Sequence, residues 1–310
     1  MVTVYRAPTP PALPQVFDRT LVRMRRDRAA ARFDAHGFLH DRVAFDFSER
    51  LSAINRQFEA VLDLGCRTGR FAFTDPSAQT IRCDLSPAMA ARAGGAVVVA
   101  DEEELPFAEE HFDLVVSALS LHAVNDLPGA LIQINRSLRP DGLFLGAVFA
   151  GETLTELRQV LGDADQAITG AALPRVAPFA DVRDLGSLLQ RARFALPVTD
   201  SERITVCYRD PFALFEDLRG MGETNALCDW RALTRGRPLR RDVLLRACTD
   251  YAERFSEPDG RIRATFEIVT MTGWAPHESQ QKPLRPGSAR ARLADALGTR
   301  ERSAGEKAGG

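Results

Sequence analysis

Glycines and carboxylates follow three short apolar runs of the chain, and their types suit the binding of a nucleoside. Gly65 and Gly69 come directly after the first run, where glycine lets the backbone turn tightly and approach a ligand. Asp84 ends the second run, where a carboxylate can accept hydrogen bonds from both ribose hydroxyls of an adenosine. Asp101 follows the third run and can accept from an adenine amino group, with Leu105 against the ring. Each feature alone is weak, but their order and spacing together predict a nucleoside cofactor site.

The candidate cofactor site extends along the chain on both sides of these residues. The segment after the fourth apolar run would lie near the far end of the ligand, because ligands of open α/β sheets bind at the carboxyl ends of strands. The predicted cofactor-binding residues are Asp63, Gly65, Cys66, Arg67, Gly69, Asp84, Leu85, Asp101, Glu102, Ser117 and Leu119.

Short apolar runs alternate with helical patterns from residue 60 onward, which is typical of a parallel sheet covered on both faces. Two further strands after the fifth complete a seven-stranded, mostly parallel α/β sheet with an antiparallel edge. The predicted strands are 60–64, 80–84, 96–100, 112–118, 143–149, 200–206 and 264–271. The predicted helices are 87–93, 128–138, 153–161, 181–193, 211–220 and 239–255.

The chain divides into segments of different composition. Residues 1–16 are rich in proline and predict an extended arm. Residues 17–58 have a helical pattern and precede the sheet domain, which we place at 59–280. The helices at 211–257 would form an insertion between the last two strands, in the manner of a lid. Residues 281–310 predict a basic, flexible tail.

Composition excludes several classes of protein. No run approaches the roughly 18 apolar residues that span a bilayer. The net charge is −2, with basic ends and an acidic middle, which does not suit a nucleic-acid binder. Solvated tails explain the basic ends better than a peripheral contact with anionic lipid. Five cysteines without a CxxC pair indicate a reducing compartment, so we expect a cytoplasmic protein in a bacterium, with the inner membrane as a possible site, or a matrix protein in a mitochondrion.

Several side chains are candidates for catalysis. His122 follows the fourth apolar run and can act as a proton acceptor near the reacting end of the cofactor. His277 follows the last strand, and Glu216 lies in the predicted lid, where carboxylates can hold a substrate arginine. His36 and His40 stand four residues apart and could bind iron, but we favour surface histidines on a solvated helix and predict no metal.

Motifs throughout residues 17–290 resemble those of the arginine hydroxylases that serve as mitochondrial complex I assembly factors, a branch of the class I methyltransferase superfamily. The loop after Asp63 is similar to the methyltransferase motif D-x-G-x-G-x-G. The other matching motifs are Phe17-Asp18-Arg19, Asp101-Glu102-Glu103, Leu105-Pro106-Phe107, Leu119-Ser120-Leu121-His122, Glu216-Asp217-Leu218 and His277-Glu278-Ser279-Gln280. The last two are similar to this branch and not to the related methyltransferases that act on the malonyl carrier protein.

The resemblance implies an S-adenosylmethionine cofactor and a protein substrate in respiratory complex I. Arg67 stands where the family has glycine, and an arginine there can point outward, pair with the cofactor carboxylate, or obstruct the site. Ala123 stands where the family has tryptophan. Three functions are therefore open: a protein-modifying enzyme, a small-molecule or carrier-protein O-methyltransferase, and a non-catalytic assembly chaperone with a degenerate cofactor site.

Overall fold

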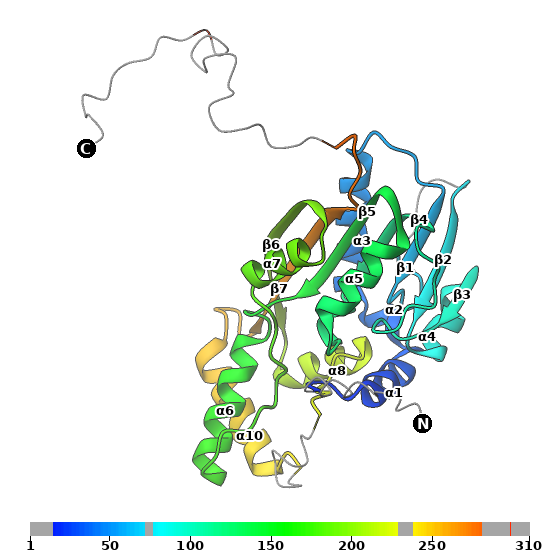
Figure 1. Cartoon of the computed structure of the whole chain (residues 1–310). Helices are drawn as coiled ribbons and strands as arrows, with labels where there is room; N and C mark the ends of the chain where they lie inside the picture. The colour runs from blue at the N-terminus through cyan, green and yellow to red at the C-terminus, as the bar shows by residue number, and fades with distance from the viewer. Residues whose placement is uncertain (1–14, 72–76, 229–237, 281–297, 299–310) are drawn as a thin grey trace, which may run out of the picture. The chain divides into compact units, whose positions relative to one another are not determined.

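Seven strands form one sheet in the order β3-β2-β1-β4-β5-β7-β6 (Figure 1). The computed structural model describes residues 15–71, 77–228, 238–280 and 298. The first five strands run parallel, while β7 pairs antiparallel with both β5 and β6. The strands are β1 (Ala60–Leu64), β2 (Gln79–Asp84), β3 (Ala96–Val99), β4 (Phe112–Ala118), β5 (Leu138–Phe149), β6 (Ala195–Tyr208) and β7 (Ile262–Trp274). The predicted seven-stranded, mostly parallel sheet with an antiparallel edge is confirmed.

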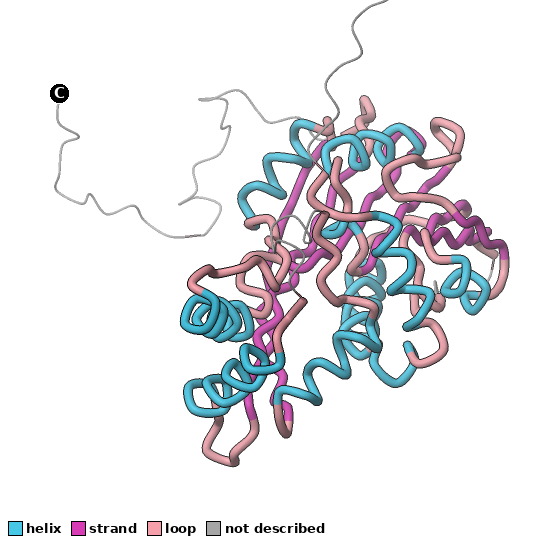
Figure 2. Tube along the Cα trace, turned by 90° about the horizontal axis from the view of Figure 1, so that it is seen from below, coloured by secondary structure: helices cyan, strands magenta, loops and turns pink. Residues whose placement is uncertain are grey.

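Helices cover both faces of the sheet, as the view turned by 90° shows (Figure 2). Neighbouring strand residues point to opposite faces, so Val61 belongs to one core and Leu62 to the other. The first core includes side chains of α3, α6, α8 and α10, and the second those of α5 and α7. The helices are α1 (Arg19–Ala29), α2 (Phe33–His36), α3 (Phe38–Ser52), α4 (Pro87–Ala93), η1 (Leu121–Ala123), α5 (Leu127–Ser137), α6 (Thr155–Thr169), α7 (Val182–Arg191), α8 (Pro211–Met221) and α10 (Arg241–Phe255).

The N-terminal segment is less regular than the predicted helical stretch at 17–58. It holds three helices, and residues 53–58 lead to β1 without helical structure. Asp18 caps α1 by accepting a hydrogen bond from the amide of Leu21 at 3.0 Å. Gly37 separates α2 from α3.

Several strands and helices are longer than the sequence predicted. β5 begins at Leu138 instead of 143, because Leu138 pairs with Phe112 across a register shift. Residues 139–142, which the predicted strand left out, therefore lie within β5. β6 and β7 pair along 195–208 and 262–274, well beyond the predicted 200–206 and 264–271. α6 continues to Thr169, two turns past its predicted end.

Among the described residues between β6 and β7, the chain forms helices α8 and α10, where the insertion was predicted. α10 packs against α6, and α8 contacts α1 and α2. Within the described residues, no helix is long and apolar enough to cross a membrane. A second unit of the chain begins at His277. The predicted basic tail at 281–310 lies, apart from Gly298, outside the described residues, as does most of the predicted arm at 1–16.

Candidate functional site

The candidate site lies at the carboxyl ends of β1 and β4, which are neighbours in the sheet although β2 and β3 separate them in the chain. This reversal of strand order is where open α/β sheets bind ligands. Gly65 follows β1 with a φ of 70°. A Cβ added there would lie 2.2 Å from the side chain of Ser120. Only glycine therefore permits this turn, and the ends of β1 and β4 are in close contact.

Asp84 and Glu102 are both fully buried near this turn. One oxygen of Asp84 accepts from the amide of Arg67 at 3.0 Å and the other from the amide of Ser86 at 2.8 Å. Glu102 accepts from the Ser120 hydroxyl at 2.5 Å. The predicted acids do converge at the ends of β2 and β3, but they are not open to solvent.

Two arginines of α1 provide most of the positive charge around these acids. Arg26 is 1% exposed, and its Nη1 lies 2.6 Å from Glu102 and 3.6 Å from Asp84. Burial alone would lower the pKa of Arg26, but the charges of Glu102 and Asp84 raise it above its ordinary value. Arg19 binds both oxygens of Asp101, at 2.6 and 3.2 Å, and also contacts Glu102.

The Arg67 side chain points into the site. It is 1% exposed and has a φ of 53°. Its Nη2 donates to the carbonyl of Leu119 at 3.0 Å and to Glu223 at 2.9 Å, and its Nη1 lies 3.8 Å from Asp84. The guanidinium thus extends from the end of β1 to the end of β4. Of the three possibilities considered for Arg67, the structure excludes the outward orientation.

Glu223, in the loop after α8, joins Arg67 to His122. Its second oxygen lies 3.0 Å from Nε2 of His122. Burial raises the pKa of Glu223, but His122, Arg67 and Arg26 outweigh that effect and hold it at about 2. Glu223 is therefore ionised at neutral pH.

The residues as arranged do not fit S-adenosylmethionine. The acids suited to its ribose and adenine are bound by Arg19 and Arg26, and Asp84 has no exposed surface. Arg67 lies across the ends of β1 and β4, where the methionine part was expected. The carboxylates are suitable hydrogen-bond acceptors for a nucleoside, but the chain's own guanidinium groups already bind them.

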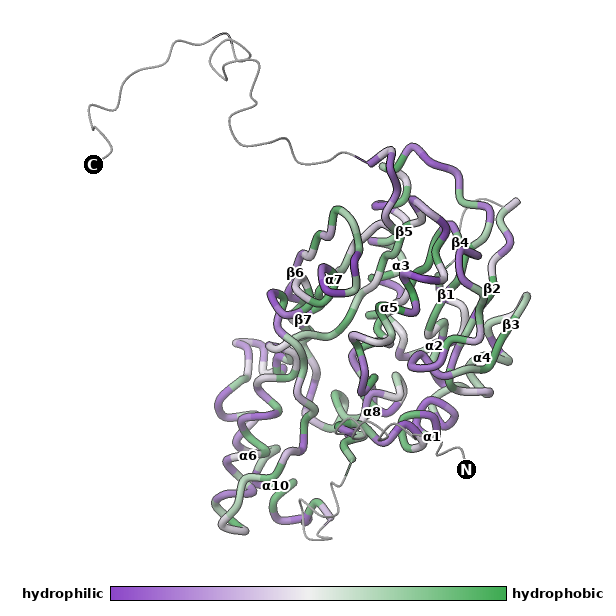
Figure 3. Tube along the Cα trace, viewed as in Figure 1, coloured by the Kyte–Doolittle hydropathy of each residue, from purple (hydrophilic) through white to green (hydrophobic). Residues whose placement is uncertain are grey.

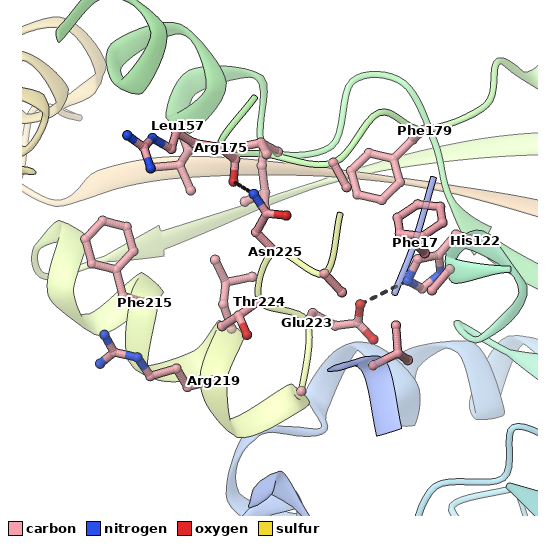
Figure 4. Close-up of a pocket in the computed structure, with 18 of the residues that line it drawn as sticks. Phe17, His122, Leu157, Arg175, Phe179, Phe215, Arg219, Glu223, Thr224 and Asn225 are labelled. Atoms are coloured by element: carbon pink, nitrogen blue, oxygen red, sulfur yellow. Dashed lines mark hydrogen bonds and ion pairs between the residues drawn. The ribbon is translucent and has the colours of Figure 1, made fainter. Parts of the chain in front are cut away.

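An open pocket of about 270 Å³ lies beside this closed region, between the loop after α8 and the segment around Phe179 (Figure 4). Its walls are mainly apolar, with residues from α6, α8 and α10. His122 lines it, and the centre of its ring lies 4.9 Å from that of Phe149 and 5.9 Å from that of Phe179. Among the described residues that line the pocket, Glu223 is the only acid.

Most of the other predicted cofactor residues are buried near the carboxyl ends of the strands. Asp63 is 2% exposed, and burial raises its pKa to about 7. Burial also raises the pKa of the Cys66 thiol far above its ordinary value. The hydroxyl of Ser117 is buried without a hydrogen-bond partner in the described part of the chain. Leu119 has a φ of 48°, and Leu85 packs near a small cluster formed by Val22, Ala123 and Ala226.

Glu216, another catalytic candidate, is not among the residues that line this pocket. The Glu216 side chain is 53% exposed and pairs with Arg32 at 2.7 Å. His277 belongs to the second unit, where its Nδ1 lies 2.7 Å from the hydroxyl of Ser279. Its position near the substrate entrance stays a prediction.

His36 and His40 are not surface histidines, so that interpretation was wrong. Their exposed fractions are 8% and 2%. His36 lies 2.6 Å from Asp217, and the lack of a side chain at Gly220 lets α8 approach its ring. Burial lowers the pKa of His40 well below its ordinary value. No group of three or more metal-binding side chains is present among the described residues.

The sequence interpretation gave no role in the site to Arg19 or Arg26. α1 does have a strongly hydrophilic sequence (Figure 3), but these two side chains face the acids. They stand seven residues apart, which places them on one face of a helix. That spacing, read together with Asp84 and Glu102, could have indicated the ion pairs.

Comparisons with known proteins agree with the fold and the motifs. Residues 62–146 match the family described as Methyltransferase domain. The chain is 40% identical to the mitochondrial arginine-hydroxylase NDUFAF5 of Danio rerio, over 90% of this chain and 89% of that protein. The human protein of the same name is 41% identical over 92% and 84%.

More distant relatives include methyltransferases that act on a carrier protein. A malonyl-[acyl-carrier protein] O-methyltransferase of Laribacter hongkongensis is 34% identical over 87% of this chain and 94% of its own length. The solved structure of the YcgJ protein from Bacillus subtilis is 15% identical, with a TM-score of 0.52 over 76% of this chain and 99% of that one. That likeness concerns the fold alone.

Proposed function

The chain belongs to the class I S-adenosylmethionine-dependent methyltransferase superfamily, and from that membership we propose that it modifies an arginine side chain of a protein substrate. It is an enzyme of this superfamily. The identity to arginine hydroxylases over most of both chains supports arginine as the target.

The single observation that carries the proposal is Glu223 in the open pocket. An ionised carboxylate stands at one side of a cavity whose other walls are mainly apolar. Arg26, Arg175 and Arg219 also line the cavity, but Arg26 is paired with Glu102 and Arg175 with Asp165, so these two charges are already neutralised. A volume of about 270 Å³ lies just below the range of drug-sized ligand sites, which begins near roughly 300 Å³. Such a cavity suits one long side chain with an aliphatic stem and a cationic end. A carboxylate has about four acceptor sites, so Glu223 can accept from a substrate guanidinium as well as from Arg67 and His122.

His122 is the proposed proton acceptor of this pocket. With the proton on Nε2 donated to Glu223, its Nδ1 keeps a free lone pair. That Nδ1 is buried and has no hydrogen-bond partner among the described residues. Glu223 would thereby fix both the ring orientation and the tautomer of His122.

S-adenosylmethionine is the proposed ligand of the acids at the ends of β2 and β3. Superfamily membership and the acceptor types of Asp84 and Asp101 support it. The arginines that hold these acids have to move before it can bind, so we assign no chemical step to it. The proposed substrate is a subunit of respiratory complex I, and the proposed location is the compartment in which that complex is assembled.

The proposal is tested by mass spectrometry of complex I subunits from cells that lack the gene or carry it. Wild type should restore a modified arginine, and Glu223→Gln should not. Glu253→Gln, which changes an exposed acid of α10, should restore it fully. Gain of one oxygen identifies hydroxylation and gain of one methylene identifies methylation. An arginine modified equally with Glu223→Gln, at equal protein level, contradicts the role of the pocket.

A non-catalytic assembly role is the second candidate, because the chain's own arginines occupy the nucleoside acids. It predicts that complex I fails to assemble without the gene while no subunit differs in mass. The same samples distinguish the two functions.

A further inference from the structure

The arginines of α1 bind the acids of the nucleoside site and thereby close this site to a ligand. We propose that α1, through Arg19 and Arg26, competes with S-adenosylmethionine for the same carboxylates, and that Arg67 competes with its methionine part. This inference rests on the cofactor proposed above and adds the condition under which it binds.

The acceptors required by the two occupants are identical. Asp101 is bound by Arg19 through both oxygens, and Asp84 is 3.6 Å from Arg26. Ribose hydroxyls and an adenine amino group are hydrogen-bond donors to the same atoms. Buried carboxylates need donors or cations at all times, because an unpaired buried charge is very costly. One set of donors can therefore leave only as the other arrives.

Arg67 is incompletely satisfied in the closed state. Its Nε and Nη1 are buried and lack hydrogen-bond partners within the described chain. Burial and the nearby charge of Arg26 lower the pKa of Arg67. A non-glycine residue with a φ of 53° adds backbone strain. The buried position of Arg67 is therefore unfavourable in free energy, and movement of its side chain out of the site would remove this penalty.

Few apolar contacts hold α1 in place. Its buried apolar side chains are Val22 and Ala29. In the described part of the chain, Val22 packs with the buried Ala123 and Ala226, and Ala29 packs with Ala30, Phe33 and Met89. Its N-terminal end is fixed separately, since the amide of Asp18 donates to the carbonyl of Ala226 at 2.8 Å. The ion pairs, more than hydrophobic burial, therefore keep α1 over the site, and their exchange can release it.

The test is titration calorimetry of the full chain with S-adenosylmethionine. Arg19→Gln and Arg67→Gly should each tighten binding by about tenfold or more relative to wild type, a difference of roughly 1.4 kcal/mol. Arg23→Gln is the matched control, since Arg23 is an exposed arginine of the same helix. Arg26 is not substituted, because its loss would leave Glu102 and Asp84 buried without their main cation.

Each outcome decides the inference. Tighter binding by Arg19→Gln and Arg67→Gly, with Arg23→Gln equal to wild type, supports it. Equal affinity in all four proteins overturns the competition while the cofactor proposal stands. No binding by any of them, with native circular dichroism spectra, overturns both the competition and the cofactor.

Discussion

Glu223 should contribute strongly to stability, because it neutralises Arg67 within the site. Its pKa falls from an ordinary 4.5 to about 2 in the folded chain. Each pKa unit corresponds to about 1.4 kcal/mol, so ionised Glu223 stabilises the fold by about 3 kcal/mol. Its side chain is 17% exposed, which limits screening by solvent. Glu223→Gln should remove this contribution at neutral pH.

The pH dependence of that difference gives the sharper test. A carboxyl group whose pKa is lower in the folded chain stabilises the fold at pH values above its pKa in the unfolded chain. This stabilisation is lost as the pH falls through its pKa in the folded chain. In urea denaturation, wild type should exceed Glu223→Gln by about 3 kcal/mol from pH 5 to 7. The gap should narrow as pH falls from 4.5 toward 2. A gap below about 1 kcal/mol at pH 7, or one that stays constant on acidification, would refute the reasoning.

Other predictions concern the strand ends. Burial raises the pKa of Asp63 to about 7, so its contribution to stability is present below its ordinary pKa and is lost as pH rises through 7. In urea denaturation at pH 8, Asp63→Asn should therefore be more stable than wild type by about 4 kcal/mol. Equal stability of the two proteins would contradict this. Gly65→Ala should cost about 2 kcal/mol or more in thermal unfolding, because the new Cβ meets Ser120 at 2.2 Å. Gly170→Ala, with a similar φ of 75° in the ordinary left-handed region and nothing within 4 Å, should cost only about 1 kcal/mol, and equal losses would show that the contact is unimportant. Burial raises the pKa of the Cys83 thiol to about 12, so iodoacetamide at pH 8 should label it only after unfolding, and rapid labelling of the native chain would disprove its burial.

Local pattern predicted the strands that are buried on both faces. β1 and β4 lie where the apolar runs indicated, because covered parallel strands contain few polar residues. The ends of β5, β6 and β7 were missed. Arg139-Pro140-Asp141-Gly142 has the composition of a turn but continues β5. The extra length of β6 depends on pairing with β7, about 60 residues away, which local propensity cannot reveal.

Sequence reasoning predicted the position of the acids in the fold and left out the arginines that bind them. Asp84 and Asp101 follow β2 and β3, and that position is fixed by the alternation of strands and helices. Arg26 contacts Glu102 across 76 positions of the chain, and within α1 only its seven-residue spacing from Arg19 distinguishes it from its exposed neighbours Arg23 and Arg28. The sequence identified Arg67 as an unusual residue, but the orientation of its side chain depends on hydrogen bonds to Leu119 and Glu223.

The competition between α1 and the cofactor can be measured directly by hydrogen–deuterium exchange with and without S-adenosylmethionine. Backbone amides of α1 (Arg19–Ala29) should exchange faster when the ligand is bound, because their helix loses its ion pairs to Asp101, Glu102 and Asp84. Those of α7 (Val182–Arg191), which packs in the other core, should not change. Slower exchange of α1 in the bound protein would contradict the account, since it would mean that the helix closes over the ligand instead of giving way to it.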